Sequence, residues 1–279
     1  ISGVIMYDET IRQSTDDGRG LVDILSSAGV IPGIKVDRGT HPIAGAKGEV
    51  VTEGLDGLRG RLAEYFDMGA RFTKWRAVIS ITDKTPSDYC ISVNAHALAR
   101  YAALAQEAGL VPIVEPEILM NGSHSIDDCY KATERTLSRT FEELSAQGVD
   151  LGAMILKPNM VISGHEAPDR ATTAEVAEQT LACLKENVPA DVPGIAFLSG
   201  GQSDEEATLN LDAINRLVKD EGAPWEITYS YGRALVATAL KTWGGSQANV
   251  KKAQKVLLER CKATSEARTG SYSPSGAAI

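Results

Sequence analysis

The chain has 279 residues, of which 43% are apolar and 5% aromatic, and its formal net charge is −9. This length and apolar content are enough for a substantial hydrophobic core. The acidic balance argues against a general nucleic-acid binder, because phosphate contacts require a basic face. No run of about eighteen apolar residues occurs, so no membrane span is expected.

The cysteines and histidines indicate neither a disulfide framework nor a metal site. The four cysteines are widely spaced and form no C-x-x-C pair, which fits a reducing, cytoplasmic setting. The four histidines form no H-x-H or H-E-x-x-H group, which is the spacing that commonly holds a metal. We therefore expect no metal and no cofactor.

Strand-like and helix-like segments alternate along the whole chain. The expected strands are 1–7, 30–37, 71–79, 110–117, 151–157, 194–198 and 225–231. The expected helices are 21–28, 52–68, 92–108, 125–147, 172–187, one that Ser203 caps, one that begins at Gly232 and Arg233, and one at 246–262. Residues 38–51 are expected to form a Gly-rich loop.

This alternation predicts a parallel sheet with right-handed crossovers, either open and doubly wound or closed into a barrel. A dinucleotide-binding fold requires G-x-G-x-x-G after its first strand, and the sequence lacks it. Seven βα units with polar strand ends match a (β/α)8 TIM barrel, here without its first βα unit. The expected division is a barrel domain at 1–263 and a flexible tail at 264–279.

One apolar run ends on a lysine, Lys157, which Pro158 follows. Proline cannot donate to a sheet ladder and holds the preceding residue extended, so a strand is expected to end here. Most lysines in such a place extend into water over an apolar stem. The alternative is an amine whose pKa is lowered by burial and by neighbouring cations, which would be a nucleophile for Schiff-base chemistry on a carbonyl.

Three other strands carry pairs of polar residues at their carboxyl ends. The pairs are Lys35 with Asp37, Lys74 with Arg76, and Glu115 with Glu117. Each pair lies on one face because side chains alternate along a strand. A solvent-exposed face would explain any one pair, but their recurrence at the same end of successive strands favours a site at the mouth of the barrel.

Two Gly-containing turns follow the last two strands. They are Ser199-Gly200-Gly201 and Ser230-Tyr231-Gly232-Arg233. Barrels commonly bind phosphate at these positions through backbone N–H groups, and the arginine adds positive charge. Such turns are structural in most loops, but their pairing at this place favours a phosphate site.

Several segments together resemble the class I fructose-bisphosphate aldolases, in the family's order and over nearly the whole chain. The segments are Gly33-Ile-Lys35-Val-Asp37, Lys74-Trp75-Arg76, Pro112-Ile-Val-Glu-Pro-Glu-Ile-Leu119, Leu156-Lys-Pro-Asn-Met160, Phe197-Leu-Ser-Gly-Gly-Gln-Ser203 and Tyr231-Gly-Arg-Ala-Leu235. The resemblance implies reversible cleavage of fructose 1,6-bisphosphate to dihydroxyacetone phosphate and glyceraldehyde 3-phosphate, in glycolysis and gluconeogenesis, without a metal.

The resemblance also implies a role for each site residue. Lys157 would form the Schiff base, Glu115 would be a general acid and base, and Lys74 and Glu117 would tune and position them. The residues implied to bind substrate or its phosphates are Lys35, Arg76, Ser199, Gly200, Gly201, Ser230, Gly232 and Arg233.

Relative to the family, the chain starts after the first barrel strand, which carries an acidic catalytic residue, and stops before the usual terminal tyrosine. The expectation is a chain that forms the covalent lysine adduct but cleaves the sugar poorly. The resemblance further implies a homotetramer in the cytoplasm, or in a plastid if a transit peptide preceded Ile1.

Two rival functions stay open at this point. One is a non-catalytic scaffold that binds partners such as cytoskeletal filaments, a secondary role that the resemblance also permits. A scaffold has no physical need for a strand-end amine beside a carboxylate. The other is a Schiff-base lyase that acts on a different phosphorylated ketose.

Overall fold

A computed structural model describes residues 1–274, which form two compact units. The first unit comprises residues 1–118, 135–157 and 188–193, and the second comprises 119–134, 158–187 and the chain from 194 onward. Parallel strands followed by helices make up each unit, which confirms the predicted α/β class. The prediction of a single domain at 1–263 stays a prediction.

In the first unit, five strands pair in parallel in the order β1, β2, β5, β6 and β7. Their bounds are β1 Gly3–Met6, β2 Ile31–Lys35, β5 Phe72–Ile79, β6 Val111–Ile118 and β7 Ile155–Leu156. The helices are α1 Asp8–Ile11, α2 Leu21–Ser27, α3 Leu58–Asp67 and α4 Asp88–Glu107, while α5 Ile126–Ala146 contributes residues to both units.

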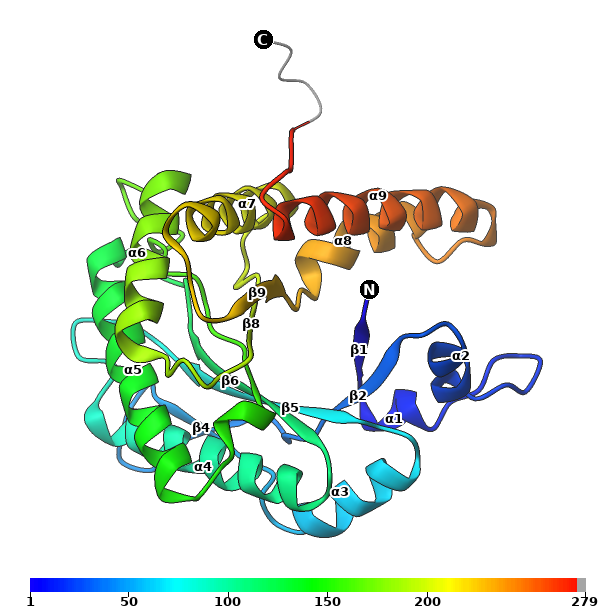
Figure 1. Cartoon of the computed structure of the whole chain (residues 1–279), viewed down its shortest axis with the longest axis horizontal. Helices are drawn as coiled ribbons and strands as arrows, with labels where there is room; N and C mark the ends of the chain where they lie inside the picture. The colour runs from blue at the N-terminus through cyan, green and yellow to red at the C-terminus, as the bar shows by residue number, and fades with distance from the viewer. Residues whose placement is uncertain (275–279) are drawn as a thin grey trace. The chain divides into compact units, whose positions relative to one another are not determined.

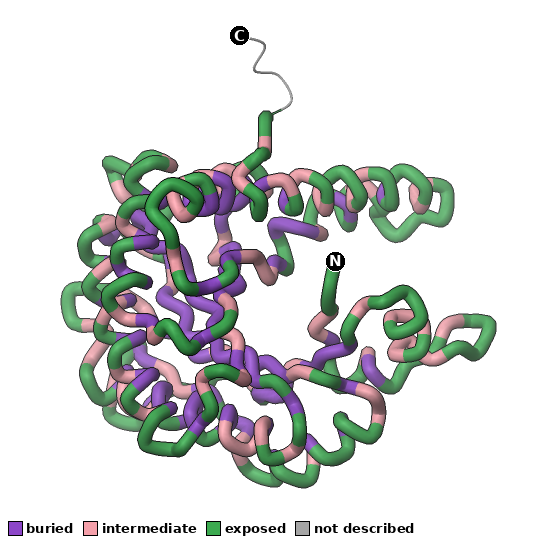
Figure 2. Tube along the Cα trace, in the orientation of Figure 1, coloured by how far each residue is buried: buried purple, intermediate pink, exposed green. Residues whose placement is uncertain are grey.

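The core of the first unit lies between β5, β6 and α4, which runs along these strands (Figure 1). Trp75 of β5 is fully buried, and its ring stacks on that of Tyr101 from α4 with 5.5 Å between centroids. The Tyr101 hydroxyl donates to the carbonyl oxygen of Ile113 at 3.0 Å. Figure 2 shows the buried positions concentrated along the strands, whereas the outward helix faces are exposed.

The predicted loop at 38–51 contains a short antiparallel hairpin that the sequence did not indicate. Its strands are β3 Thr40–Pro42 and β4 Val50–Thr52, so α3 begins at Leu58 and not at 52. The side chain of the buried Asn94 on α4 donates to the carbonyl oxygen of Val50 at 2.9 Å and accepts from the Thr52 N–H at 3.3 Å. Val50, Val51 and Thr52 are β-branched residues that favour a strand, and these tertiary hydrogen bonds attach that strand to α4.

The strand predicted at 151–157 is mostly not a strand. Residues Leu151–Ala153 form a 3-10 turn, in which the Asp150 side chain accepts from the Gly152 N–H at 2.9 Å, and β7 covers only Ile155–Leu156. Lys157 still continues the pairing, because its N–H donates to the carbonyl oxygen of Val114 at 2.8 Å. The extended geometry predicted at the lysine is therefore correct, while the predicted strand begins too early.

In the second unit, β8 Gly194–Phe197 and β9 Glu226–Tyr229 pair in parallel. Its helices are α6 Thr173–Asn187, α7 Asp204–Glu221, α8 Arg233–Trp243 and α9 Val250–Arg268, and α8 and α7 both pack against α9 (Figure 1). The helix predicted at 172–187 begins with a capping box, in which Glu175 accepts from the Thr172 N–H at 2.7 Å and the Glu175 N–H donates to the Thr172 hydroxyl oxygen at 3.3 Å.

The end of α9 corrects the predicted start of the tail. The helix continues through Arg268, and Thr264 and Ala267 are fully buried, so residues 264–268 do not belong to a flexible segment. Gly270 then has a φ of 56°, a left-handed conformation typical just past a helix end. The last part of the predicted tail, 275–279, lies outside the described residues.

Candidate active site

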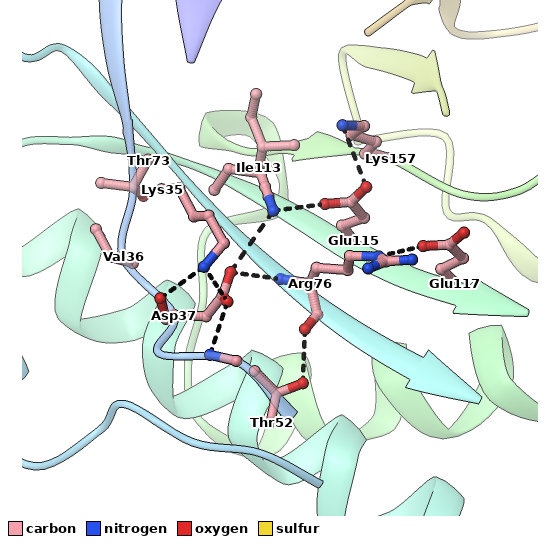
Figure 3. Close-up of polar contacts among 12 residues, drawn as sticks. Lys35, Val36, Asp37, Thr52, Thr73, Arg76, Ile113, Glu115, Glu117 and Lys157 are labelled. Carbon is pink, nitrogen blue, oxygen red and sulfur yellow. Dashed lines mark hydrogen bonds and ion pairs between the residues drawn. The ribbon is translucent and has the colours of Figure 1, made fainter. Parts of the chain in front are cut away.

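The polar pairs of the first unit meet because the strands are parallel and in register. Lys35 on β2 lies opposite Lys74 on β5, and Arg76 lies opposite Glu115 on β6. Lys157 follows Leu156, which lies opposite Val114, so the lysine comes next to Glu115. Side chains at paired positions of neighbouring strands lie on the same face of the sheet, and Figure 3 shows Lys157 and Glu115 pointing toward each other. The structure thus brings together the six residues predicted for this part of the site, which are Lys35, Lys74, Arg76, Glu115, Glu117 and Lys157.

Lys157 is not a solvated strand-end lysine. Only 9% of its side chain is exposed, and its Nζ lies 3.1 Å from Oε1 of Glu115. Burial lowers the pKa of Lys157 from its ordinary value; the carboxylate of Glu115 opposes this shift, and the positive charge of Lys74 adds to it. The amine is therefore neutral at a lower pH than an exposed lysine, which is the form that a nucleophile requires.

Glu115 lies between two lysines. Its Oε2 is 3.1 Å from Nζ of Lys74, while its Oε1 is paired with Lys157. Only 5% of the Glu115 side chain and 9% of the Lys74 side chain are exposed. A carboxylate held this close to an amine can take a proton from it and return it to a leaving group in the same place.

Lys35 and Arg76 are each paired with a carboxylate and remain partly exposed. Nζ of Lys35 lies 2.6 Å from Oδ1 of Asp37, and the guanidinium of Arg76 pairs with Glu117. The exposed fractions of the two basic side chains are 24% and 38%, so both can meet a ligand without leaving their partners. Glu117 contacts Arg76 and not Lys157 in this arrangement (Figure 3).

Asp37 also belongs to this cluster, although no role is predicted for it from the sequence. Its side chain is 3% exposed and pairs with Lys35 and, at 3.5 Å, with Nζ of Lys74. The alternation of β2 placed Asp37 on the same face as Lys35, which was the only signal. Its contact with Lys74 depends on the register of a neighbouring strand, and the chain order does not reveal that register.

The two predicted phosphate turns lie together in the second unit. The Ser230 N–H donates to the carbonyl oxygen of Phe197 at 2.8 Å, which joins the end of β9 to that of β8. Gly201 has a φ of 87°, and a Cβ built there would lie 3.8 Å from a guanidinium nitrogen of Arg233 and 3.2 Å from Nε2 of His165. Glycine therefore leaves the backbone open beside a cation, which suits an anionic ligand.

Two observations concern other classes of site within residues 1–274. In this stretch, no group of three or more histidine, cysteine, aspartate or glutamate side chains is arranged to hold a metal ion. Likewise, none of the helices formed by these residues has both the length and the hydropathy needed to cross a membrane.

Comparison with known proteins gives the same family over nearly the whole chain. The model of the class-I fructose-bisphosphate aldolases, described as glycolytic, matches residues 1–278. A probable fructose-bisphosphate aldolase class 1 of Xanthomonas axonopodis pv. citri is 54% identical over 273 residues, which cover 98% of this chain and 81% of that protein.

Fructose-bisphosphate aldolase 6, cytosolic, of Arabidopsis thaliana is 54% identical over 272 residues, or 98% of this chain and 75% of that protein. Among solved structures, the fructose-bisphosphate aldolase of Plasmodium falciparum, in a ternary complex with TRAP and a small-molecule inhibitor, matches with a TM-score of 0.95 and 47% identity. That match covers 98% of this chain and 78% of the other chain, and it confirms the predicted TIM-barrel class of fold.

Proposed function

Because this chain belongs to the class-I fructose-bisphosphate aldolases, we propose that Lys157 is the amine through which it cleaves its sugar. Members of this class cleave fructose 1,6-bisphosphate through a Schiff base in glycolysis. The observation that carries the assignment is the buried Lys157 amine, 9% exposed, at 3.1 Å from Glu115. Its lowered pKa supports a nucleophilic role.

The first half of the reaction forms the Schiff base. Neutral Nζ of Lys157 attacks the C2 carbonyl carbon, whose oxygen takes up a proton to become a hydroxyl group. The new nitrogen centre gives a proton to the Glu115 carboxylate, which passes it to that hydroxyl group as it leaves as water. The product is an iminium ion at C2. The Lys74 ammonium, 3.1 Å from Oε2 of Glu115, pairs with the carboxylate between these transfers.

The second half breaks the carbon–carbon bond. The Glu115 carboxylate, ionised again after the first half, accepts the proton of the C4 hydroxyl. C4 becomes the aldehyde of glyceraldehyde 3-phosphate, and the electron pair of the C3–C4 bond moves into the iminium to give an enamine. Protonation at C3 and addition of water then release dihydroxyacetone phosphate and regenerate the neutral amine of Lys157. The proton count closes over one turnover.

We assign binding roles to the remaining predicted residues. Lys35 and Arg76 contact substrate through their exposed ammonium and guanidinium groups. Glu117 orients Arg76 through their ion pair. The residues proposed to hold a phosphate are Ser199, Gly200, Gly201, Ser230, Gly232 and Arg233, and the support for this is the open backbone at Gly201 beside the Arg233 guanidinium.

We also propose a cytoplasmic homotetramer. The support is family membership and the cytosolic Arabidopsis relative. The Plasmodium relative was solved in complex with TRAP, which supports a protein partner as a secondary role, and binding of cytoskeletal filaments stays a prediction. Light scattering should give four times the 29.7 kDa chain mass. A mass of one chain at micromolar concentration would contradict the tetramer.

Borohydride trapping tests the central assignment. The chain is incubated with dihydroxyacetone phosphate, reduced, digested and mapped by mass spectrometry. We expect a stable adduct on the Lys157 peptide that disappears in Lys157→Met. The matched control is Lys185→Met, a surface lysine paired with Glu221, which should keep the adduct. An adduct on another lysine, or none in a folded sample, would overturn the assignment.

A further inference from the structure

Asp37 is a buried carboxylate that the proposed reaction does not use. It follows β2, and its side chain is 3% exposed. Oδ1 pairs with Nζ of Lys35 at 2.6 Å, and Oδ2 lies 3.5 Å from Nζ of Lys74. The same two oxygens accept the N–H groups of Gly39 at 3.2 Å and Arg76 at 3.3 Å. These contacts fix the direction of the carboxylate from both β2 and β5.

Continuous ion pairs connect Asp37 to the nucleophilic lysine. The chain of pairs runs through Lys35, Asp37, Lys74, Glu115 and Lys157. These three amines and two carboxylates carry no net charge when one amine is neutral. A buried cluster strongly favours zero net charge, because desolvation penalises an unpaired charge. The group is therefore balanced in the state in which Lys157 can attack a carbonyl.

The other charged or titratable groups around Asp37 and Lys157 are accounted for separately. Arg76 pairs with Glu117, and this pair is neutral. The ring of Tyr7 lies 5.8 Å from Nζ of Lys35, Arg61 donates to the Val36 carbonyl oxygen at 2.9 Å, and the Tyr101 hydroxyl is held by Ile113. None of these contacts supplies a second anion to Lys74.

Lys74 has two carboxylate partners, Glu115 and Asp37, and the second of them restricts where its ammonium group can lie. A lysine side chain has four rotatable bonds, and a single carboxylate partner leaves it free to move between the two carboxylate oxygens. Without Asp37, the Lys74 ammonium could settle between both oxygens of Glu115 and compete with Lys157 for Oε1. With Asp37 on its other side, Lys74 lies 3.1 Å from Oε2 of Glu115 and 3.5 Å from Oδ2 of Asp37.

We propose that Asp37 is a positioning residue for the cleavage reaction: it holds Lys74 on one oxygen of Glu115 and leaves the other oxygen for Lys157. This inference rests on the proposed role of Lys157 and adds a residue that acts through Lys74. Among the described residues, the Asp37 side chain contacts Lys35, Lys74, Gly39 and Arg76, and no contact with Lys157 is found. Its effect on the reaction passes through the position of an ammonium group.

The test uses Asp37→Asn, which keeps the shape and one acceptor oxygen but removes the charge. We expect kcat for fructose 1,6-bisphosphate cleavage to fall about 100-fold with a much smaller change in KM, which is the scale expected for a misplaced catalytic group. The pH midpoint of borohydride trapping on Lys157 should also move to lower pH, because removal of a nearby negative charge disfavours the ammonium form. Asp37→Glu, which keeps the charge, should retain the wild-type midpoint.

A double-mutant cycle separates positioning from folding. If Asp37 acts through Lys74, Asp37→Asn should cost little further activity in a Lys74→Met chain. The matched control is Asp212→Asn, a buried aspartate that pairs with Arg216 at 2.5 Å and accepts the Tyr272 N–H at 2.8 Å. This control should leave kcat and the trapping midpoint unchanged.

Each outcome decides the inference. Additive losses in the cycle, an unchanged trapping midpoint, or an Asp37→Asn chain that does not fold would each overturn it and leave Asp37 a structural residue. The wild-type chain in the same assay keeps the two claims apart. If wild type forms no adduct on Lys157, the Schiff-base assignment fails; if it does and Asp37→Asn behaves identically, only the role of Asp37 fails.

Discussion

At the scale of single residues, the amine of Lys157 lies under opposing influences. Burial and the charge of Lys74 lower its pKa, whereas the carboxylate of Glu115 raises it. A nearby carboxylate therefore makes the amine less available as a nucleophile while it serves as the proton carrier. Glu115 thus has two effects: it raises the pKa of Lys157, and it carries a proton during the reaction. The two can be separated experimentally, since only the second requires a group that can be protonated.

The pH dependence of borohydride trapping in the wild-type chain reports the pKa of Lys157. Only the neutral amine attacks, so adduct formation should decline as the pH falls through the Lys157 pKa. Because burial lowers that pKa below the ordinary 10.5, the decline should occur at a lower pH than for an exposed lysine. The measurement is the rate of adduct formation at early times across the pH range. A midpoint at the ordinary lysine value would contradict the burial argument.

Glu115→Gln should divide the two effects. With the negative charge gone, the pKa of Lys157 falls further, and the trapping midpoint should move to still lower pH. Steady-state cleavage should nevertheless slow by about 10²- to 10⁴-fold, because an amide cannot carry the proton. The control is Glu143→Gln, a mostly buried glutamate paired with Arg139 on α5, for which neither quantity should change. A higher midpoint in Glu115→Gln would reverse the assigned sign.

The positions of Lys74, Glu115 and Lys157 were largely predictable, because side-chain alternation along a strand and the effect of Pro158 on Lys157 involve only residues close in the chain. The structure gathers Lys157, Glu115 and Lys74 as expected. The sequence placed Asp37 on one face of its strand but did not identify its partner, since the contact with Lys74 is made between two neighbouring strands. The roles assigned to the phosphate turns are still predictions.

At the scale of elements, the hairpin of β3 and β4 depends on contacts from outside itself. Asn94 on α4 bonds to Val50 and Thr52 of β4, and the Thr52 hydroxyl donates to the Arg76 carbonyl oxygen at 2.7 Å. The hairpin is thus attached to a strand that carries site residues. The sequence pattern predicted a loop here because residues 38–51 are rich in glycine, which local rules assign to turns; Gly39, Gly45 and Gly48 do have positive φ angles.

Asn94→Ala should measure the strength of this attachment. The change removes the hydrogen bonds of the Asn94 side chain to Thr52, Val50 and Cys90, and it leaves the Thr52 N–H without its side-chain acceptor. The free energy of unfolding, measured with a chemical denaturant, should fall by about 2–3 kcal/mol. Asn187→Ala, which loses one bond to the Cys183 carbonyl oxygen, should cost less than about 1 kcal/mol. Equal losses of unfolding free energy in the two variants would mean that the bonds from Asn94 to the hairpin add no more stability than one ordinary side-chain hydrogen bond.

The same contrast explains which other elements were predicted correctly. Helices with a strong apolar pattern and a capping box, such as α6, were placed within a residue or two. The 3-10 turn at Leu151–Ala153 was not, because its apolar residues resemble a strand and the deciding contact is a single bond to Asp150. A prediction from the local hydrophobic pattern fails where the hydrogen bond of one side chain determines the backbone conformation.

At the scale of the whole molecule, the open question is whether the two units unfold together, as the predicted single domain at 1–263 requires. Barrels of this class usually fold as one domain of about 250 residues. The chain carries natural probes for this question, because three of its four free cysteines are buried and they are divided between the two units. Cys90 belongs to the first unit, and Cys129 and Cys183 belong to the second.

Cysteine labelling turns these probes into a prediction. Burial raises the pKa of Cys90 and Cys129 to about 11 and that of Cys183 to about 12, and the thiolate is the reactive form. In the native chain an aromatic disulfide reagent should therefore label Cys261, which is partly exposed, quickly and the other three only through unfolding. If the chain is one cooperative domain, Cys90 and Cys183 should give the same opening free energy, measured from labelling rates at rising denaturant concentration. Protection that disappears at clearly different denaturant concentrations would show two independently unfolding units and contradict the single domain.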